Sequence, residues 1–378
     1  MKFAEIFPPG EFLKEELEAR NWSQIELADI IGRPVKLVNE IVLAKRAVTP
    51  ETAIQLGDAL GTGPEFWMNL ESQYQLSKVV RQEGDVARRA RLYERFPVRE
   101  MVKRGWIDAA ESIEVLERQF MSYFGLRTLD DAITFPHAAK ASGSVNSVQF
   151  AWLFAAHNLA KRIVAPKYRP DALRAAMPRL EALMTAPEEA RHVTRLLHEC
   201  GVRFVVVEPL PASLIDGACF WLADDQPAIA LSTRLDRIDN FWFVLRHECE
   251  HVLCGHGKQD AFIVDEDVLG SPAESKSEEE QMADEAAANF GVSRTELESY
   301  IARVKPYYFS EQKLVNFAAR LRVHPGVVLG RLQFRLREDD KNVWRYLRPL
   351  LVKTREFLIQ SAPHDGWGTV TLPTTGAK

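Results

Sequence analysis

Two histidines and a glutamate lie close together in the segment VLRHECEHVLCG. His247 and Glu248 are adjacent, and His251 lies four residues after His247. Residues four apart lie on one face of a helix, so both imidazoles can bind the same metal ion. Glu248 lies beside them and can accept a proton from a metal-activated water molecule and pass it to a leaving amine. This is the chemistry of peptide-bond hydrolysis. The alternative is an ordinary helix with His and Glu on its surface.

A tetrahedral site of this kind needs a third ligand from the protein. The metzincin class would supply a histidine at position 257, which is Gly257 here, and this excludes that class. His256 fits better beside the site or in solvent. The segment EEEQMADEAAANF offers carboxylates on a second helix, and we assign Glu280 to the metal and Asp284, one turn later, to orienting a histidine ring. Glu280 taken alone could equally be a solvated surface residue. The ligand types predict zinc, although manganese or iron could occupy the same set.

A pair of short helices near the N-terminus predicts a second kind of site. Ser23 and Glu26 form a capping-box pattern at the start of the first helix, which stops at Gly32, and Pro34 opens the second. In a helix-turn-helix, the first helix braces against the DNA backbone and the second presents its N-terminal side chains to the bases. The candidate DNA contacts are the polar and basic side chains of this region: Gln24, Arg33, Lys36, Asn39, Glu40, Lys45 and Arg46. The alternative is a helical bundle with an ordinary solvated face.

These candidate contacts have different expected roles. Asn39 can pair with adenine, and Lys36 suits guanine or a phosphate. Lys45 and Arg46 follow the second helix and suit phosphates, which position the protein without reading the sequence. The net charge is −5, so any DNA-binding charge must be local. A second basic stretch runs from Lys78 to Arg104.

Residues 8–76 resemble the HigA family of antitoxins, within the larger Xre/Cro-like helix-turn-helix class, most clearly in VNEIV, AVTPETAIQL and EFWMNLESQY. The resemblance implies a homodimer that binds a palindromic operator in double-stranded DNA and often represses its own operon beside a toxin gene. The family usually has Gly before Arg-Arg after the second helix, where this chain has Ala44. A tight turn with positive φ costs Ala more than Gly, so we expect a local difference in geometry.

Residues from about 186 to 336 resemble the ImmA/IrrE family of zinc peptidases, in three short strands and in RHECEHVLCGHG, EQMADEAAANFGV and VHPGVVLGRLQF. The resemblance implies that Glu280 is the third metal ligand, that Glu248 is the general base, and that the substrate is a repressor protein or the domain is tied to stress-responsive derepression. The family often ends the ligand helix in Leu-Leu-Met-Pro, where this chain has the segment 290–293, FGVS; the difference bears on substrate shape. Arg331 in GRLQF could hold a carboxylate or a substrate carbonyl, or form a structural ion pair.

The rest of the chain sets the architecture that must position these sites. Its 378 residues suggest two or three domains, and 46% hydrophobic with 27% charged residues is typical of a soluble globular protein. No apolar run approaches the roughly 18 residues of a membrane span, and the N-terminus lacks the apolar region of a signal peptide. The four cysteines have no paired metal-ligand spacing and suggest reduced thiols. We therefore expect a cytoplasmic location and no membrane partner.

Helical patterns fill residues 11–75 and continue less regularly to about 200, after which three short apolar runs predict strands at 202–210, 217–223 and 227–232. A helix from Asp239 or Asn240 to Cys254 carries the histidines. Residues 257–279 predict a loop, 280–304 and 310–345 predict helical regions, and 361–378 predict a tail. The expected fold is mainly α with a small α+β domain: an all-α helix-turn-helix domain (1–76), a helical linker or central domain (77–185), a zincin-like peptidase domain with a short sheet and the His-Glu-x-x-His helix (186–345), and a C-terminal extension (346–378).

These observations predict a sequence-specific DNA-binding transcriptional regulator whose zinc-dependent endopeptidase domain cleaves a partner or repressor protein. The alternative is an antitoxin or autorepressor of a toxin–antitoxin operon, with a cognate toxin as its partner. In that case the peptidase-like domain is a non-catalytic sensing or structural module. Self-cleavage is a third reading of the same residues.

Overall fold

The computed structural model describes residues 7–78, 84–133, 146–258, 263–266, 277–304, 309–337 and 347–365. Its internal contacts divide the chain into two compact units, Met1–Ala87 and Arg88–Lys378. In these ranges no helix has the length and apolarity that crossing a membrane requires.

The first unit is all-helical and packs around a small apolar core that includes Leu13, Leu27, Leu56 and Trp67. Both halves of the capping box predicted at Ser23 are present. The helices of this unit are α1 Pro9–Arg20, α2 Gln24–Ile31, α3 Val35–Val42, α4 Pro50–Leu60 and α5 Pro64–Lys78.

The second unit combines helices with one sheet. Before the sheet come α6 Asp85–Arg95, α7 Val98–Lys103, α8 Ile113–Phe124, α9 Ser147–Lys161, α10 Pro170–Ala182, the 3-10 helices η1 Leu183–Thr185 and η2 Pro187–His192, and α11 Val193–Glu199. After the first three strands come α12 Ile238–Cys254, α13 Glu278–Ala288, α14 Arg294–Val304, α15 Glu311–Leu321, α16 Pro325–Leu336, the 3-10 helix η5 Arg348–Leu350 and α17 Arg355–Leu358. Each of the two helical regions predicted after residue 280 is therefore divided in two, the first at Gly291 with its positive φ of 75° and the second just before Pro325.

The described strands form a single mixed sheet in the order β4-β2-β3-β1-β5. The three predicted strands are present as β1 Arg203–Val207, β2 Ile215–Trp221 and β3 Pro227–Leu231. β3 is parallel to β1 and antiparallel to β2. The sequence patterns did not predict the two edge strands. β4, Ile263–Glu266, pairs antiparallel with β2 inside the segment expected to be a loop, and β5, His364–Asp365, pairs parallel with β1 inside the expected tail. Such short strands depend on backbone pairing with a neighbour, which local composition does not report.

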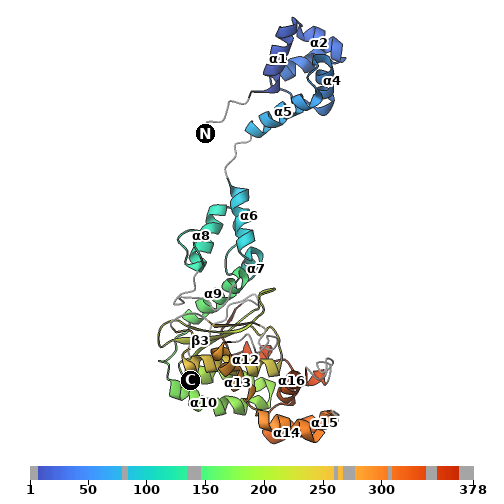
Figure 1. The fold of residues 1–378 in the computed structure, drawn as a ribbon. Coiled ribbons are helices and arrows are strands. Elements are labelled where there is room, and N and C mark those ends of the chain that lie inside the picture. Colours follow the sequence, from blue (N-terminus) through green and yellow to red (C-terminus); the bar gives the residue numbers. More distant parts are fainter. Residues whose placement is uncertain are drawn as a thin grey trace. The chain divides into compact units, whose positions relative to one another are not determined.

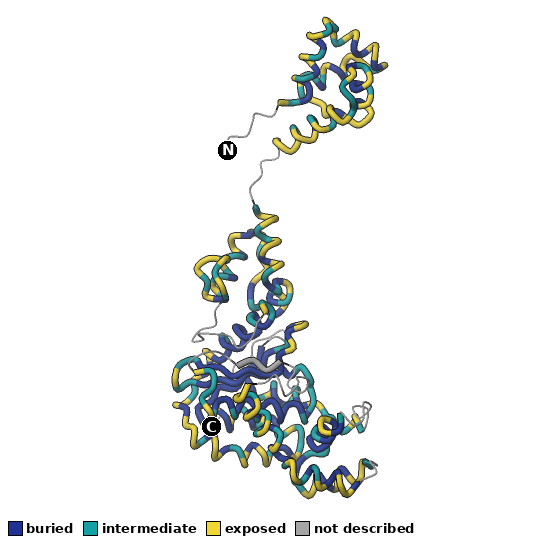
Figure 2. The backbone as a smooth tube through the Cα atoms, in the orientation of Figure 1, coloured by how far each residue is buried: buried dark blue, intermediate teal, exposed yellow. Residues whose placement is uncertain are grey.

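Helices cover both faces of this sheet (Figure 1). Alternate residues of β1 point to opposite sides: Val205 and Val207 pack with α6–α9, whereas Phe204 and Val206 pack with α10–α12 and the later helices. Figure 2 shows the sheet and the helix beneath it as the most buried part of the unit. Helices α6–α9, which lie in the region predicted to be a helical linker or central domain (77–185), share a core with the sheet, and β5 brings part of the C-terminal extension into the sheet. This is why the contacts place 88–378 in one unit.

Candidate metal centre and nucleic-acid interface

α12 carries both histidines and the glutamate of the His-Glu-x-x-His motif. The helix ends at Gly255, whose φ of 73° lets its backbone N–H reach the last carbonyls. His247, Glu248 and His251 are all fully buried. Burying three polar side chains on one helix costs free energy unless they bind a metal ion or form hydrogen bonds with neighbouring groups. The groups that surround them therefore indicate their role.

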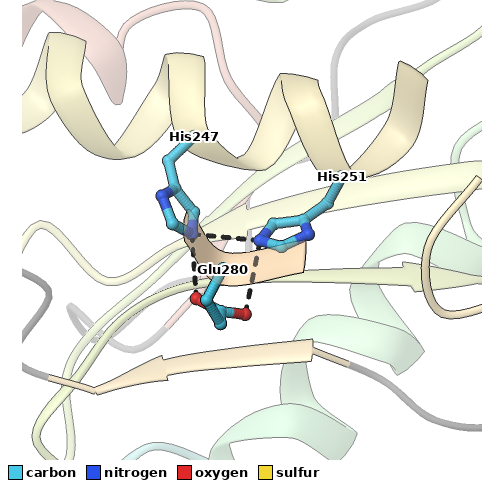
Figure 3. Close-up of side chains that lie close together, drawn as sticks. All are labelled: His247, His251 and Glu280. Atoms are coloured by element: carbon cyan, nitrogen blue, oxygen red, sulfur yellow. Dashed lines mark hydrogen bonds and ion pairs between the residues drawn. The ribbon is translucent and has the colours of Figure 1, made fainter. Parts of the chain in front are cut away.

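Glu280 from α13 faces the same space as the two imidazoles (Figure 3). The Nε2 atoms of His247 and His251 lie 3.0 Å apart. Glu280 Oε2 lies 3.4 Å from His247 Nε2, and Glu280 Oε1 lies 3.5 Å from His251 Nε2. α13 approaches α12 closely because its facing positions are the small, fully buried Ala283 and Ala287. Two helices distant in sequence thus bring three ligand-type atoms together.

This arrangement fits a tetrahedral metal ion. Ligand atoms at about 2.0–2.1 Å from a tetrahedral centre lie roughly 3.4 Å from one another. The two Nε2 atoms lie 3.0 Å apart, and each of them lies close to that edge length, at 3.4 and 3.5 Å, from a different oxygen of the Glu280 carboxylate. Two imidazole nitrogens and one carboxylate oxygen are a donor set that zinc accepts, with the fourth position left for water or substrate.

Asp284 lies one turn after Glu280, on the outer side of the His247 ring. Its Oδ1 is 3.2 Å from His247 Nδ1, the ring nitrogen that points away from Glu280. A carboxylate in this position fixes the tautomer and the orientation of an imidazole whose other nitrogen is a metal ligand. Asp284 and Glu280 thus lie at opposite nitrogens of the His247 ring.

The Glu248 side chain lies against β2 at Gly217. A Cβ atom at Gly217 would collide with Glu248 Oε1 and would lie only 2.7 Å from Val244 Cγ1. Only glycine leaves room for the carboxylate at this point of the strand. The sequence patterns did not identify Gly217 as a site residue, because nothing in the strand itself shows which helix residue packs upon it.

Arg331 on α16 makes a contact different from those expected. Its guanidinium donates a hydrogen bond to the Ala287 backbone carbonyl near the end of α13, and it lies over the Phe243 ring at 4.7 Å from the centroid. Burial lowers the pKa of Arg331 to about 10, opposed by the nearby charges of Asp239 and Asp284. Arg331 therefore connects α16 to the helix that carries Glu280.

In the first unit, α2 and α3 form the expected helix pair. Asn39 Nδ2 on α3 donates to Gln24 Oε1 at the start of α2, with a separation of 3.2 Å. The Lys36 side chain is 85% exposed, and Lys45 is exposed after the helix. These side chains are available to a ligand on the α3 surface.

The three other candidate DNA contacts, Arg33, Glu40 and Arg46, have partners within this unit. Glu40 Oε2 lies 3.1 Å from Arg46 Nη1, and Glu40 Oε1 lies 3.9 Å from Lys36 Nζ. Arg33 Nε donates to Gln55 Oε1 on α4 at 2.8 Å. Glu40 thus offsets the charge of two neighbouring cations, and Arg33 is turned toward α4.

Ala44 adopts a φ of 54°, in the left-handed region. The turn after α3 therefore keeps the backbone conformation that a glycine would adopt, and Ala44 bears the steric cost.

Comparison with known proteins separates the two units in the same way. Residues 13–67 match the family model described as helix-turn-helix, and residues 201–333 match the model described as the IrrE N-terminal-like domain, a peptidase family. The HTH-type transcriptional regulator YddM of Escherichia coli is 33% identical over 92 residues, which are 24% of this chain and 97% of that protein. The chain belongs to the helix-turn-helix family. It joins this DNA-binding domain to an IrrE-like domain.

Further relatives of the helix-turn-helix domain are small proteins. Virulence-associated protein A of Dichelobacter nodosus is 37% identical over 73 residues, which are 19% of this chain and 72% of that protein. A solved structure of an addiction module antidote protein of the HigA family from Coxiella burnetii is 30% identical, with a TM-score of 0.21, and the match covers 24% of this chain and 95% of that one. Each of these relatives matches a quarter of the chain or less.

The helix-turn-helix match contains all seven candidate DNA contacts, and the IrrE-like match contains His247, Glu248, His251, Glu280 and Asp284. The peptidase family is typically metal-dependent, and His247, His251 and Glu280 form a cluster that could hold a metal ion.

The second basic stretch lies largely between the two matches, and several of its arginines have partners inside the second unit. Arg88 pairs with Glu114 and Glu117, Arg89 donates to the Ala110 carbonyl, and Arg104 pairs with Glu208. Arg81 lies outside the described residues. The charge of this stretch thus stabilises the helical layer of the second unit.

Proposed function

We propose that the protein is a sequence-specific DNA-binding regulator whose IrrE-like domain is a zinc-dependent endopeptidase that cleaves a partner or repressor protein. The observation that carries the proposal is the meeting of His247, His251 and Glu280, whose ligand-type atoms lie within 4.8 Å of one another, with the buried Glu248 on the same helix as the two histidines. DNA binding would confine the cleavage to one locus.

In this proposal the residues of α12 and α13 have separate roles. His247, His251 and Glu280 would hold the ion, and Asp284 would keep the His247 ring in its ligating tautomer. A bound zinc ion would lower the pKa of a water molecule and polarise a peptide carbonyl. Glu248, held against β2 at Gly217, accepts the proton of the attacking water and delivers it to the leaving nitrogen.

In the first unit, we propose that α3 enters the major groove. Asn39 reads a base, braced by its hydrogen bond to Gln24, while Lys36, Lys45 and Arg46 contact phosphates. Glu40 and Arg33 order neighbouring side chains through their contacts with Arg46 and Gln55. The homodimer on a palindromic operator belongs to the proposal through the resemblance of residues 8–76 to the HigA family.

The experiment compares wild type with Glu248→Gln, both loaded with zinc and incubated with the proteins encoded beside this gene. Intact-mass analysis should find a partner fragment with wild type alone. Glu285→Gln is the matched control, because it makes the same chemical change at an exposed position on α13. Fragments of the protein itself in wild type alone would indicate self-cleavage.

Intact partners with wild type would contradict the endopeptidase and favour an antitoxin or autorepressor with a non-catalytic IrrE-like domain. Operator binding measured on the same samples separates the two readings. The Glu248→Gln variant should keep wild-type DNA affinity, because Glu248 lies outside the helix-turn-helix unit.

A further inference from the structure

His256 lies just beyond the end of α12, where the chain turns back toward the metal centre. Gly255 and Gly257 on either side of it both have positive φ, 73° and 75°, which allows this tight reversal. The His256 side chain is 12% exposed. Its position next to α12 makes it a neighbour of His251.

Three contacts hold His256 in place. Its backbone N–H donates to the His251 carbonyl at 2.9 Å, and its own carbonyl accepts a hydrogen bond from Trp221 Nε1 on β2 at 2.8 Å. Its ring Nδ1 lies 2.9 Å from His251 Nδ1, within hydrogen-bond distance. The residue is thus fixed from both the helix and the sheet, and its ring is aimed at a metal-site histidine.

We infer that His256, backed by Glu279, is a positioning residue that holds the His251 ring with Nε2 toward the metal position. The inference rests on the proposed metal centre. It adds His256, for which the sequence indicated either a position beside the site or one in solvent.

The chemistry of imidazole gives the direction of this hydrogen bond. A neutral ring has one N–H donor and one acceptor, so His251 with Nε2 as ligand carries its proton on Nδ1. His256 Nδ1 is the atom placed to accept it. The proton of His256 then lies on Nε2, the atom 4.0 Å from Glu279 Oε1. Glu279, His256 and His251 form one chain.

This chain parallels the pair formed by Asp284 and His247. Each ligand histidine has a partner on the ring nitrogen that faces away from Glu280, one from α13 and one from the turn after α12. Loss of such a supporting partner lowers metal affinity about 10- to 100-fold, because the ring is then free to rotate or to adopt the other tautomer.

The test is zinc affinity of the full-length protein, measured by competition with a chromophoric chelator. His256→Ala should weaken zinc binding about 10- to 100-fold. His256→Asn should recover most of the affinity, because its amide oxygen can accept the proton of His251. His198→Ala, an exposed histidine of α11, should leave the affinity at the wild-type value.

Cobalt substitution gives a readout that does not depend on activity. The visible absorption of bound Co²⁺ should change in His256→Ala and return toward wild type in His256→Asn. Equal zinc affinity and equal spectra in wild type and His256→Ala would overturn the inference while leaving the metal centre intact. Equal losses in the Ala and Asn variants would also overturn it, since packing alone would then account for the effect. Absence of zinc binding in wild type would overturn the proposed function itself.

Discussion

Glu40 lies between two cations on the proposed DNA-binding surface, so replacing it has a calculable effect. Its carboxylate is 3.1 Å from Arg46 and 3.9 Å from Lys36. Glu40→Gln removes one negative charge and frees about one unit of positive charge for phosphates. One additional phosphate contact makes the slope of log affinity against log salt steeper by about 0.9. Relative to 1 M salt, this corresponds to about eightfold tighter binding at 0.1 M salt.

The assay is fluorescence anisotropy of the full-length protein on a mixed-sequence duplex over a range of salt concentrations. Glu18→Gln is the matched control. It removes the same charge and frees Lys14, 4.0 Å away, but on α1 rather than α3. An unchanged salt slope in Glu40→Gln would refute the reasoning, because Lys36 and Arg46 would then not contact phosphates. An equally steep slope in Glu18→Gln would also refute it, because the effect would then come from net charge alone.

Three further changes test the two units. Ala44→Gly should stabilise the first unit by about 0.5–1 kcal/mol in urea denaturation, because the left-handed φ of 54° costs Ala more than Gly loses in backbone entropy. A less stable variant would show that Ala44 bears no steric cost in this turn. Gly217→Ala should lower the free energy of unfolding of the second unit by about 1–3 kcal/mol and displace Glu248, because the added Cβ would lie 3.0 Å from Glu248 Cδ and 2.7 Å from Val244 Cγ1. Unaltered stability in urea would mean that the contact is not tight. Free zinc at about 100 times its Kd should raise the free energy of unfolding of the second unit by about 2.7 kcal/mol, seen as a higher melting temperature; His247→Ala should abolish the rise, and a rise that persists would place the zinc elsewhere.

Local features of the fold could be predicted because they depend on neighbours in sequence. The start of α2 follows from Ser23 and Glu26, and the end of α12 follows from Gly255, because caps satisfy the free backbone groups of the helix within one turn. The strand β1 likewise lies within the apolar run 202–210 that predicted it. These elements were found where the patterns predicted them.

Long-range features could not be predicted in the same way. The edge strands β4 and β5 exist through their pairing with β2 and β1, and the helices before residue 185 join the second unit because their apolar faces match one side of the sheet. Arg88 and Arg104 belong to the second basic stretch of the sequence, and the sequence did not show that both are paired with carboxylates of the same unit. A residue's partner is decided by packing, which periodicity does not encode.

The candidate metal centre shows both kinds of information. By itself, the sequence determined that His247, Glu248 and His251 share a helix at a spacing suited to one ion, and that Glu280 and Asp284 lie one turn apart on another, because the helical repeat converts spacing into geometry. Only the tertiary structure decided that these helices meet, that Gly217 makes room for Glu248, and that His256 faces His251. The physical reason is that such contacts join segments distant in the chain, and it is the close packing of the whole unit that brings them to bonding distance.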